Sequence, residues 1–239
     1  RYYAECTVTV IAAGLVWDGD TPSEQPDGFD TPDPDDPEAD PNLIVINDTQ
    51  ALAYFAAQVN AGNSYSGKTV RLGRDLDLNN QAWTPIGRSG SAFSGTFDGN
   101  GMTLSNLYVE NTESEFAGLF GMLNTGTVKN LNVHNASVKG LSSVGVIAGG
   151  YTGKIENCHV TGLIQVEGSY KVGGIIGYAY ATVTDSSVAG DEGSYVRGTY
   201  LEADLEGDNV GGVIGFVGEG SKTYSGLSAS ISVEGTRKV

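Results

Sequence analysis

Val128-Lys-Asn130-Leu-Asn-Val133 is the stretch that decides the fold, because it recurs in related form along the chain. The other copies are Leu104-Ser-Asn106-Leu-Tyr-Val109, Ile155-Glu-Asn157-Cys-His-Val160 and Val183-Thr-Asp185-Ser-Ser-Val188. The Asn or Asp at the third position advances by 24, 27 and 28 residues from copy to copy. Repeats of about 20 to 50 residues are typical of stacked architectures, in which each unit contacts its neighbours along the sequence.

A second motif, bounded by glycine, keeps the same period. It reads Gly118-Leu-Phe-Gly121, Gly145-Val-Ile-Ala-Gly149, Gly173-Gly-Ile-Ile-Gly177 and Gly211-Gly-Val-Ile-Gly215, and its last glycine advances by 28, 28 and 38 residues. The long step predicts an insertion at 190–200 that projects from the wall of the repeat domain. Insertions of this kind often form binding loops.

Each repeat holds three short runs of β-branched residues separated by Gly or Asn, which fit one coil of a parallel β-helix. We therefore predict an all-β fold, a right-handed parallel β-helix (β-solenoid) of ~28-residue repeats from about Thr69 to Val233. Stacking would place Val128, Ile155 and Val183 in one interior ladder. The marker Asn residues would form a second ladder at a corner, and the glycines would allow positive φ or close approach of the backbone.

A capping helix over 49–60 is predicted ahead of the coils, at the start of a repeat domain that spans residues 43–239. Asp48 or Thr49 can cap its first turn, and Gly62 follows its end. Its apolar residues are spaced for one helical face: Leu52, Phe55, Ala56 and Val59. We expect this face to cover the open end of the first coil, where unpaired strand edges would otherwise invite aggregation.

Residues 17–42 are rich in Pro, Asp, Glu and Gly, and they predict an acidic, extended linker. Carboxylates at alternate positions can also surround Ca²⁺, which takes about six to eight oxygen ligands. The candidates for such a site are Asp33, Asp35 and Asp36. Because the prolines stiffen this stretch and no Asp-x-Asp-x-Asp-Gly loop is complete, we expect no metal here and no cofactor elsewhere in the chain.

Ala4-Glu-Cys-Thr-Val-Thr-Val-Ile11 alternates small or apolar residues with polar ones, as a half-buried strand does. One strand is not stable alone. The segment resembles the closing strand of bacterial Ig-like domains of the second type, which implies that residues 1–16 are the trailing strand of an Ig-like domain upstream in the same parent chain. Cys6 in this run and Cys158 in a later one are expected to be buried, free thiols.

The motif Gly118-Leu-Phe-Gly121 and its later variants resemble the GLUG motif, a repeat of secreted and surface bacterial proteins. The runs Trp83-Thr-Pro-Ile-Gly87 and Phe93-Ser-Gly-Thr-Phe-Asp-Gly-Asn-Gly101 resemble the entry segment of such domains, so the resemblance covers about Leu52 to Gly215. Members include adhesin-like proteins and immunoglobulin-cleaving metallopeptidases with a separate catalytic domain. The resemblance implies a non-catalytic, extracellular or cell-surface module of a larger bacterial protein that serves adhesion or domain presentation.

Charge excludes two classes of partner. The formal net charge of −16 opposes binding to nucleic acid or to an anionic membrane. Residues 1–60 hold 12 acidic residues and 1 basic residue, so most of this acidity is local. No apolar run approaches the roughly 20 residues of a membrane helix. We therefore expect no nucleic-acid partner and no membrane insertion by this segment.

The motifs of catalysis are weak. A zinc peptidase motif needs two His one helical turn apart beside a Glu, whereas the only histidines are His134 and His159, both in strand-like runs. Cleavage of a polysaccharide by carboxylates and basic groups on an exposed sheet is the enzymatic alternative. Its candidates are Asp75, Asp77 and Asp98 with Arg74 and Arg88 nearby, and each carboxylate also fits an edge strand or a turn.

Binding has more support than catalysis. Stacked coils would align Met122, Gly150, Tyr178 and Phe216 in one column, with Tyr151 and Tyr180 beside it. The candidate ligand-binding residues are these tyrosines and the polar residues of the predicted insertion, namely Tyr151, Tyr178, Tyr180, Tyr195, Arg197 and Tyr200. Exposed, such a column could hold a host or matrix glycan or protein. Internal stacking of the rings and a purely structural spacer are the alternatives.

Overall fold

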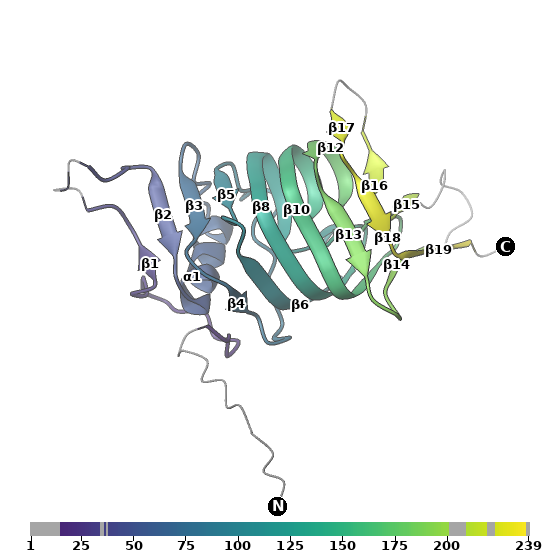
Figure 1. The fold of residues 1–239 in the computed structure, drawn as a ribbon, viewed down its shortest axis with the longest axis horizontal. Helices are drawn as coiled ribbons and strands as arrows, with labels where there is room; N and C mark the ends of the chain where they lie inside the picture. The colour runs from purple at the N-terminus through teal and green to yellow at the C-terminus, as the bar shows by residue number, and fades with distance from the viewer. Residues whose placement is uncertain (1–14, 34–35, 37, 201–208, 219–222, 238–239) are drawn as a thin grey trace, which may run out of the picture.

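The computed structural model describes residues 15–33, 36, 38–200, 209–218 and 223–237. The strand predicted at 4–11, with Cys6, lies outside these residues. Within them the chain forms a parallel β-solenoid whose coils stack along the long axis of the molecule, with one helix, α1 (Thr49–Asn60), at the N-terminal end (Figure 1). The predicted fold class is confirmed.

The strands follow one another around the coils. They are β1 (Phe29–Asp30), β2 (Leu43–Ile46), β3 (Thr69–Leu72), β4 (Leu76–Asp77), β5 (Thr96–Asp98), β6 (Thr103–Asn111), β7 (Phe116–Ala117), β8 (Phe120–Gly140), β9 (Ser143–Gly145), β10 (Ala148–Gly168), β11 (Lys171–Gly173), β12 (Ile176–Thr184), β13 (Ser187–Gly190), β14 (Tyr195–Tyr200), β15 (Asn209–Gly211), β16 (Ile214–Val217), β17 (Tyr224–Ser225), β18 (Ser228–Ser230) and β19 (Ser232–Arg237). One sheet runs in the order β1-β2-β3-β5-β8-β10-β12-β16, and a short second sheet runs β15-β11-β9-β7.

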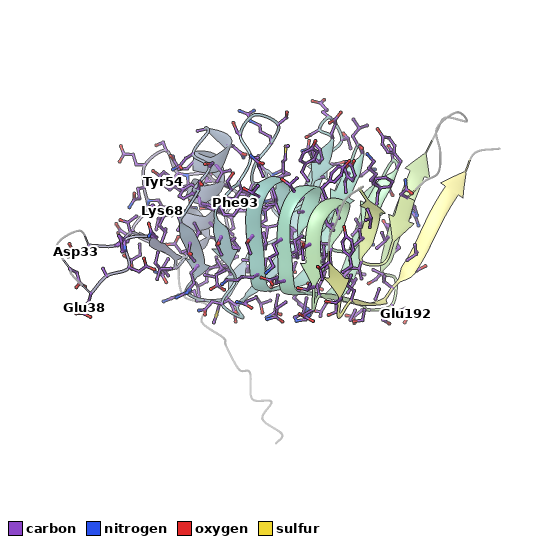
Figure 2. All side chains as sticks on the ribbon, turned by 90° about the horizontal axis from the view of Figure 1, so that it is seen from above. Asp33, Glu38, Tyr54, Lys68, Phe93 and Glu192 are labelled. Atoms are coloured by element: carbon purple, nitrogen blue, oxygen red, sulfur yellow. The ribbon has the colours of Figure 1, made fainter. Side chains whose placement is uncertain are left out.

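The interior ladder is confirmed. Val128, Ile155 and Val183 are register partners on β8, β10 and β12, and each is fully buried. Val166 stacks in the same way on another wall, between partners in β8 and β14. Figure 2 shows Phe93 lying among the coils, and its side chain is also fully buried. Apolar ladders of this kind give each coil the core that it could not form alone.

The Asn corner differs from the prediction in one respect. Asn130, Asn157 and Asp185 align at a corner, where their φ angles are 53, 50 and 50°. Asn106 instead aligns with Asn135 at a second corner, since Leu104 pairs with Val133 and Leu107 with Ala136. The spacing of 24 residues between Asn106 and Asn130 is shorter than the others because these two residues lie at different corners. Asn serves both corners because it tolerates the left-handed conformation and its amide bonds the next coil.

Within each ladder the amide groups bond from coil to coil. Asn157 Nδ2 donates to Asn130 Oδ1 over 2.9 Å, and Asn130 Nδ2 donates to Asp98 Oδ1 over 3.0 Å. At the second corner Asn135 Nδ2 donates to Asn106 Oδ1 over 3.2 Å. These bonds satisfy polar groups at bends where the backbone ladder is interrupted.

The glycine corner serves close approach of the backbone. A Cβ added at Gly145 would lie 2.5 Å from the carbonyl oxygen of Ala148 and 2.6 Å from Cα of Ile176. Gly118 faces the carbonyl oxygen of Gly145 even more closely. Neither glycine has positive φ, so the absence of a side chain is what the fold requires at these positions.

The N-terminal end contains one more coil than predicted. The expected start near Thr69 is wrong, because β2 already pairs in parallel with β3, and α1 therefore lies inside the first coil. The helix has the predicted bounds and cap, with Ala51 N donating to Asp48 Oδ1 over 2.7 Å. Phe55 on its buried face stacks on Phe97 with ring centroids 5.9 Å apart, so the helix does plug the apolar interior.

The segment predicted as a linker is in part packed against the solenoid. Trp17 is only 3% exposed and packs edge-on against Trp83. The backbone N–H of Trp17 donates to the carbonyl oxygen of Asp77 over 2.8 Å. Further along, β1 pairs antiparallel with β2 and buries Phe29. The few apolar residues of an acidic stretch thus cover the edge of the first coil.

The insertion predicted at 190–200 is wrong. β14 (Tyr195–Tyr200) is part of the wall, in register with β10 on one side and β19 on the other. Gly168 pairs with Gly198 on the next coil, and Lys171 pairs with Asn209. The chain needs 3 residues from Gly168 to Lys171 but 11 from Gly198 to Asn209, so eight extra residues follow Gly198. Residues 201–208 lie outside the described part of the chain.

Candidate binding surface

The predicted column of residues after the motif glycine is confirmed by the register. Met122, Gly150, Tyr178 and Phe216 are successive partners on β8, β10, β12 and β16. Gly150 has no side chain in this column, and the space beside it is already filled: a Cβ there would lie 2.8 Å from the carbonyl oxygen of Tyr178 and 3.3 Å from Cε1 of Phe116. Aromatic rings from two sheets meet at this position.

We call this cluster the aromatic patch, and it consists of Phe116, Tyr151, Lys171, Tyr178, Tyr180 and Phe216. Tyr151 is 37% exposed, and the other five side chains are half-buried. Burial of all three predicted tyrosines would have excluded a binding role, and none of them is buried. The structure therefore places the patch on the outside of the solenoid.

Tyr151 reaches the surface by an unusual backbone conformation. Its register partners Leu123 and Ala179 are fully buried, as is Phe93, the partner of Leu123. Tyr151 has φ of 107°, a region that non-glycine residues rarely adopt, and its side chain faces outward. The register between β8 and β10 shifts between Thr152 and Gly153, where β8 carries the extra residue Thr125.

Tyr151 is the centre of the ring contacts in the patch. Its ring centroid lies 6.2 Å from Phe116, 6.3 Å from Tyr178 and 6.0 Å from Tyr180, at steep interplanar angles of 87, 87 and 66°. Tyr178 lies 5.1 Å from both Tyr180 and Phe216. Edge-to-face contacts of this kind are favourable and fix the rings relative to one another.

Lys171 adds a positive charge to the patch. Its Nζ lies 4.0 Å from the centroid of the Tyr178 ring and 5.5 Å from that of Phe216, both within the range of cation–π attraction. The pKa of the Tyr178 hydroxyl is raised to about 12, mainly because the group is partly buried and also because it is hydrogen-bonded with Tyr180. The hydroxyl therefore stays neutral at physiological pH, and its hydrogen bond is made to Tyr180 within the patch.

The other predicted binding residues belong to a different group of contacts. Arg197 Nε donates to Glu234 over 2.8 Å, its Nη1 lies 3.7 Å from Glu167, and its guanidinium covers the Tyr195 ring at 4.2 Å. None of these partners is in the aromatic patch. For Tyr200 the structure describes the backbone alone, in β14. Arg197 and Tyr195 thus stabilise the wall.

The carboxylates proposed for glycan cleavage are engaged in turns. Asp98 is 6% exposed, accepts from Asn130 and lies 3.4 Å from Arg71. Asp77 accepts from the backbone of Asn79 over 2.7 Å. Asp75 accepts from the backbone of Thr103 over 2.8 Å. Each carboxylate therefore has a structural task, and the described contacts do not favour catalysis.

Asp98 shows how strongly such a turn can hold a charge. Burial opposes its ionisation, but donors from Asn130 and the backbone of Asn100, with the charges of Lys129 and Arg71, outweigh this effect and hold the pKa of the carboxyl below its ordinary value of 3.8. Asp98 is therefore a fixed anion within the wall.

The histidines and the described cysteine have structural environments. His134 is exposed, and its Nδ1 lies 3.1 Å from the hydroxyl of Thr161. His159 Nδ1 lies 2.8 Å from the hydroxyl of Ser187. Cys158 is free and fully buried, and burial raises the pKa of its thiol to about 12, so it is not a poised nucleophile.

The calcium candidates lie in the loop between β1 and β2, and Figure 2 shows Asp33 at the end of the molecule away from the C-terminal coils. Asp36 N donates to the carbonyl oxygen of Asp33 over 3.2 Å, while Asp35 lies outside the described residues. Among the residues that the structure describes, no group of three or more His, Cys, Asp or Glu side chains could hold a metal ion.

One hollow was not anticipated from the sequence. A groove of about 420 Å³ lies between α1 and the two tryptophans, lined by Trp17, Trp83, Ala53, Ala56 and Asn60 among others. The indole N–H groups donate to backbone carbonyls, and the Asn60 amide bonds the backbone on both sides of Ile86. These polar groups are thus committed to holding the first coils together. The aromatic patch remains the better candidate for ligand binding.

Comparisons with known proteins give two partial relatives. No protein-family model matches the chain. Halomucin of Haloquadratum walsbyi is 45% identical over 101 residues, which cover 41% of this chain and 1% of halomucin. A protein of Evansella cellulosilytica described as a Gly-rich membrane protein is 30% identical over 121 residues, 46% of this chain and 14% of that protein. The chain thus spans only a small part of the length of either relative.

The solved structures support the fold. A chain from Bacteroides ovatus, described as an immunoglobulin A1 protease, superimposes with a TM-score of 0.60 at 20% identity, over 80% of this chain and 62% of that one. At this identity the likeness concerns the fold alone. In the described part of the present chain, no helix is both long and apolar enough to span a membrane. The comparisons therefore establish a β-solenoid with similarity to segments of much longer proteins.

Proposed function

We propose that this chain is a non-catalytic, extracellular repeat module of a larger bacterial surface protein, and that its aromatic patch binds a host or matrix glycan or protein. The observation that carries the proposal is Tyr151, which is turned outward against the backbone preference of a tyrosine. Strained residues persist where the surrounding structure holds them, and they cluster at functional sites. A ring exposed in this way offers a surface for a sugar face or a protein side chain.

Several features of the chain support an adhesive role. The solenoid forms a long wall on which the patch is rigid, since its rings are held by contacts from both sheets. The similarity to segments of halomucin and of a Gly-rich membrane protein fits a module within a large surface protein. The GLUG-like glycine motif and the Ig-like pattern at 4–11 fit the same architecture. Presentation of neighbouring domains is compatible with ligand binding.

A glycan and matrix-protein array with the whole chain tests the proposal. We expect selective binding by the wild type and its loss in Tyr151→Gly, which removes the ring and relieves the backbone. Tyr108→Ser is the matched control, because Tyr108 is a half-buried tyrosine on β6 that contacts Glu110 rather than the patch. Binding that survives Tyr151→Gly would contradict a role of the patch, and an array without any signal would favour the spacer.

A second assay addresses the enzymatic alternative. Release of reducing sugar from the arrayed glycans should be absent for the wild type, because the candidate carboxylates are occupied in turns. Release that is abolished by Asp98→Asn in a folded variant would show cleavage and overturn the non-catalytic proposal.

A further inference from the structure

A second hollow adjoins the aromatic patch. It has a volume of about 280 Å³, and Phe116 of the patch is one of its lining residues. The ring of Phe116 also contacts that of Tyr151, with the centroids 6.2 Å apart. The hollow and the patch therefore form one continuous surface. We call the hollow the Arg88 pocket, and its lining residues include Pro85, Gly87, Arg88, Asn111 and Ser114.

The segment that carries Arg88 is held against the end of α1. Asn60 Nδ2 donates to the carbonyl oxygen of Pro85 over 3.1 Å, and Asn60 Oδ1 accepts from the backbone N–H of Gly87 over 2.8 Å. The backbone of Arg88 bonds that of Ser91 in both directions. Arg88 Nη2 donates to the carbonyl oxygen of Asn60 over 3.2 Å. A guanidinium carries several N–H donors, so this bond positions the group and leaves other donors for a ligand.

Two further polar side chains line the pocket. The hydroxyl of Ser114 accepts from the backbone N–H of Phe116 over 3.5 Å, which leaves its own hydrogen for another acceptor. Asn111, at the end of β6, is half-buried, and its amide has no bonding partner among the described residues. The pocket thus offers a guanidinium, an amide and a hydroxyl beside an aromatic ring. Such donors suit an oxygen anion.

The charges around the site favour a ligand with few anionic groups. Arg88 in the pocket and Lys171 over the rings of the patch form no ion pair with a carboxylate that the structure describes. Glu113 and Glu115 flank Ser114 and are exposed, so they weaken the local positive potential. The net charge of −16 opposes a polyanion at longer range. A single anionic group in direct contact with Arg88 is therefore the better match.

Strand pairing leaves little room for a peptide at this site. β10 pairs with β8 on one side and β12 on the other, and β12 pairs with β16. β7 lies at the edge of the short sheet but is only 2 residues long. Peptides that bind by adding a strand need a longer free edge. Recognition here therefore depends on ring faces and polar side chains, which suit a sugar.

We propose that the Arg88 pocket and the aromatic patch form one binding site for an oligosaccharide that carries a single acidic sugar. One sugar ring stacks on Tyr151 and Phe116. The carboxylate or sulfate of the acidic sugar accepts from Arg88, whose planar fork can bond two oxygens at once, and from Asn111. The inference rests on the function proposed for the patch, and it adds the charge of the ligand and the residue that recognises it.

The experiment uses the whole chain and several hexose oligosaccharides, each in a neutral form, a form with one hexuronic acid and a form with one sulfate. An acidic peptide is a further probe. Dissociation constants are measured at low and high salt for the wild type, Arg88→Gln, Arg88→Lys and Arg74→Gln. Arg74→Gln is the matched control, because Arg74 is an exposed arginine between β3 and β4 that does not line the pocket. Urea denaturation checks the folding of each variant.

We expect the wild type to bind an acidic form about tenfold or more tightly than its neutral parent. This preference should shrink as the salt concentration is raised. Arg88→Gln should abolish the preference and leave the affinity for the neutral form unchanged, whereas Arg88→Lys should keep part of it because the charge remains. Arg74→Gln should change neither affinity.

The outcomes separate this inference from the function on which it rests. Binding that requires Tyr151 but does not distinguish acidic from neutral forms would overturn the inference alone. Equal weakening of both forms by a folded Arg88→Gln variant would do the same, because Arg88 would then only shape the site. A preference of the wild type that does not depend on salt would exclude the role of charge without any substitution. Binding of the acidic peptide alone would overturn the assignment to a glycan, and no binding to any probe would overturn both proposals.

Discussion

Tyr151 and Leu123 are register partners on β10 and β8 whose side chains lie on opposite faces of the wall. Leu123 is fully buried, whereas Tyr151 is 37% exposed. The difference follows from the φ of 107° at Tyr151. A parallel stack places partners on the same face, so this backbone must be held by its surroundings against its own preference.

Tyr151→Gly should therefore leave the chain as stable as the wild type or more so, while ligand binding is lost. Glycine adopts positive φ without a steric cost, so the relief of about 1 kcal/mol or more should offset the lost ring contacts. The free energy of unfolding from urea denaturation measures the effect. Tyr151→Ala is the control, because it removes the ring and keeps the strain, and we expect it to be less stable than Tyr151→Gly. The reverse order would contradict strain at this position.

The repeat could be predicted from the sequence because two independent requirements keep one period. Interior positions such as Val128 and Ile155 must be apolar in every coil, and a glycine such as Gly145 must leave room for the next coil. Both requirements act on the residue type directly, and so both are visible in the sequence. The capping helix could be predicted for the same reason, since its cap at Asp48 and its apolar face depend on nearby residues alone.

The register of individual corners was harder to predict. Val133-His-Asn135 has the same pattern as Val128-Lys-Asn130, so Leu104-Ser-Asn106 could be stacked on either by sequence. The pairing of Leu104 with Val133 is decided by how many residues each coil needs to travel between its corners. That length is a property of the whole coil and not of the motif.

The candidate site was predicted only in part. Tyr151, Tyr178 and Tyr180 come together because the glycine motif fixes their register, whereas no local pattern shows the positive φ with which Tyr151 turns outward. The spacing of the glycine motif predicts an insertion without showing where its residues lie, and for this reason the sequence places Arg197 in it, although eight of the extra residues follow Gly198. The sequence does not predict the burial of Trp17, because isolated apolar residues in an acidic stretch carry no periodic signal.

Gly145→Ala should destabilise the solenoid strongly. The new methyl group would lie 2.5 Å from the carbonyl oxygen of Ala148 and 2.6 Å from Cα of Ile176, so two coils would have to separate. We expect a loss of at least about 2 kcal/mol in the free energy of unfolding. Gly235→Ala is the matched control, since nothing lies within 4 Å of its added Cβ, and it should change stability by less than about 0.5 kcal/mol. Similar effects of the two substitutions in denaturant titrations would contradict the role given to the glycine corner.

Asn130 should be replaceable by glycine at a smaller cost than by alanine. Asn130→Gly keeps the backbone at φ 53° and removes the bonds to Asp98 and Asn157, for an expected loss of about 1–3 kcal/mol. Asn130→Ala removes the same bonds and adds a left-handed penalty of about 1–2 kcal/mol. Thermal and urea denaturation of both variants measure the difference. Equal stability of the two would show that the left-handed corner does not constrain this residue.

Asp98→Asn should weaken the fold in a way that depends on pH. Because the folded state holds the pKa of Asp98 below its ordinary value of 3.8, the ionised carboxylate stabilises the fold above that value, and the contribution is lost as the pH falls through 3.8 towards the folded pKa. At neutral pH we expect the variant to be less stable by about 1.5–3 kcal/mol, the range for bonds to a charged group. The gap between wild type and variant in urea unfolding should then narrow as the pH is lowered below 3.8. A gap that stays constant across this range would mean that Asp98 acts through its shape and its neutral hydrogen bonds, and that the charges of Arg71 and Lys129 contribute nothing to the wall.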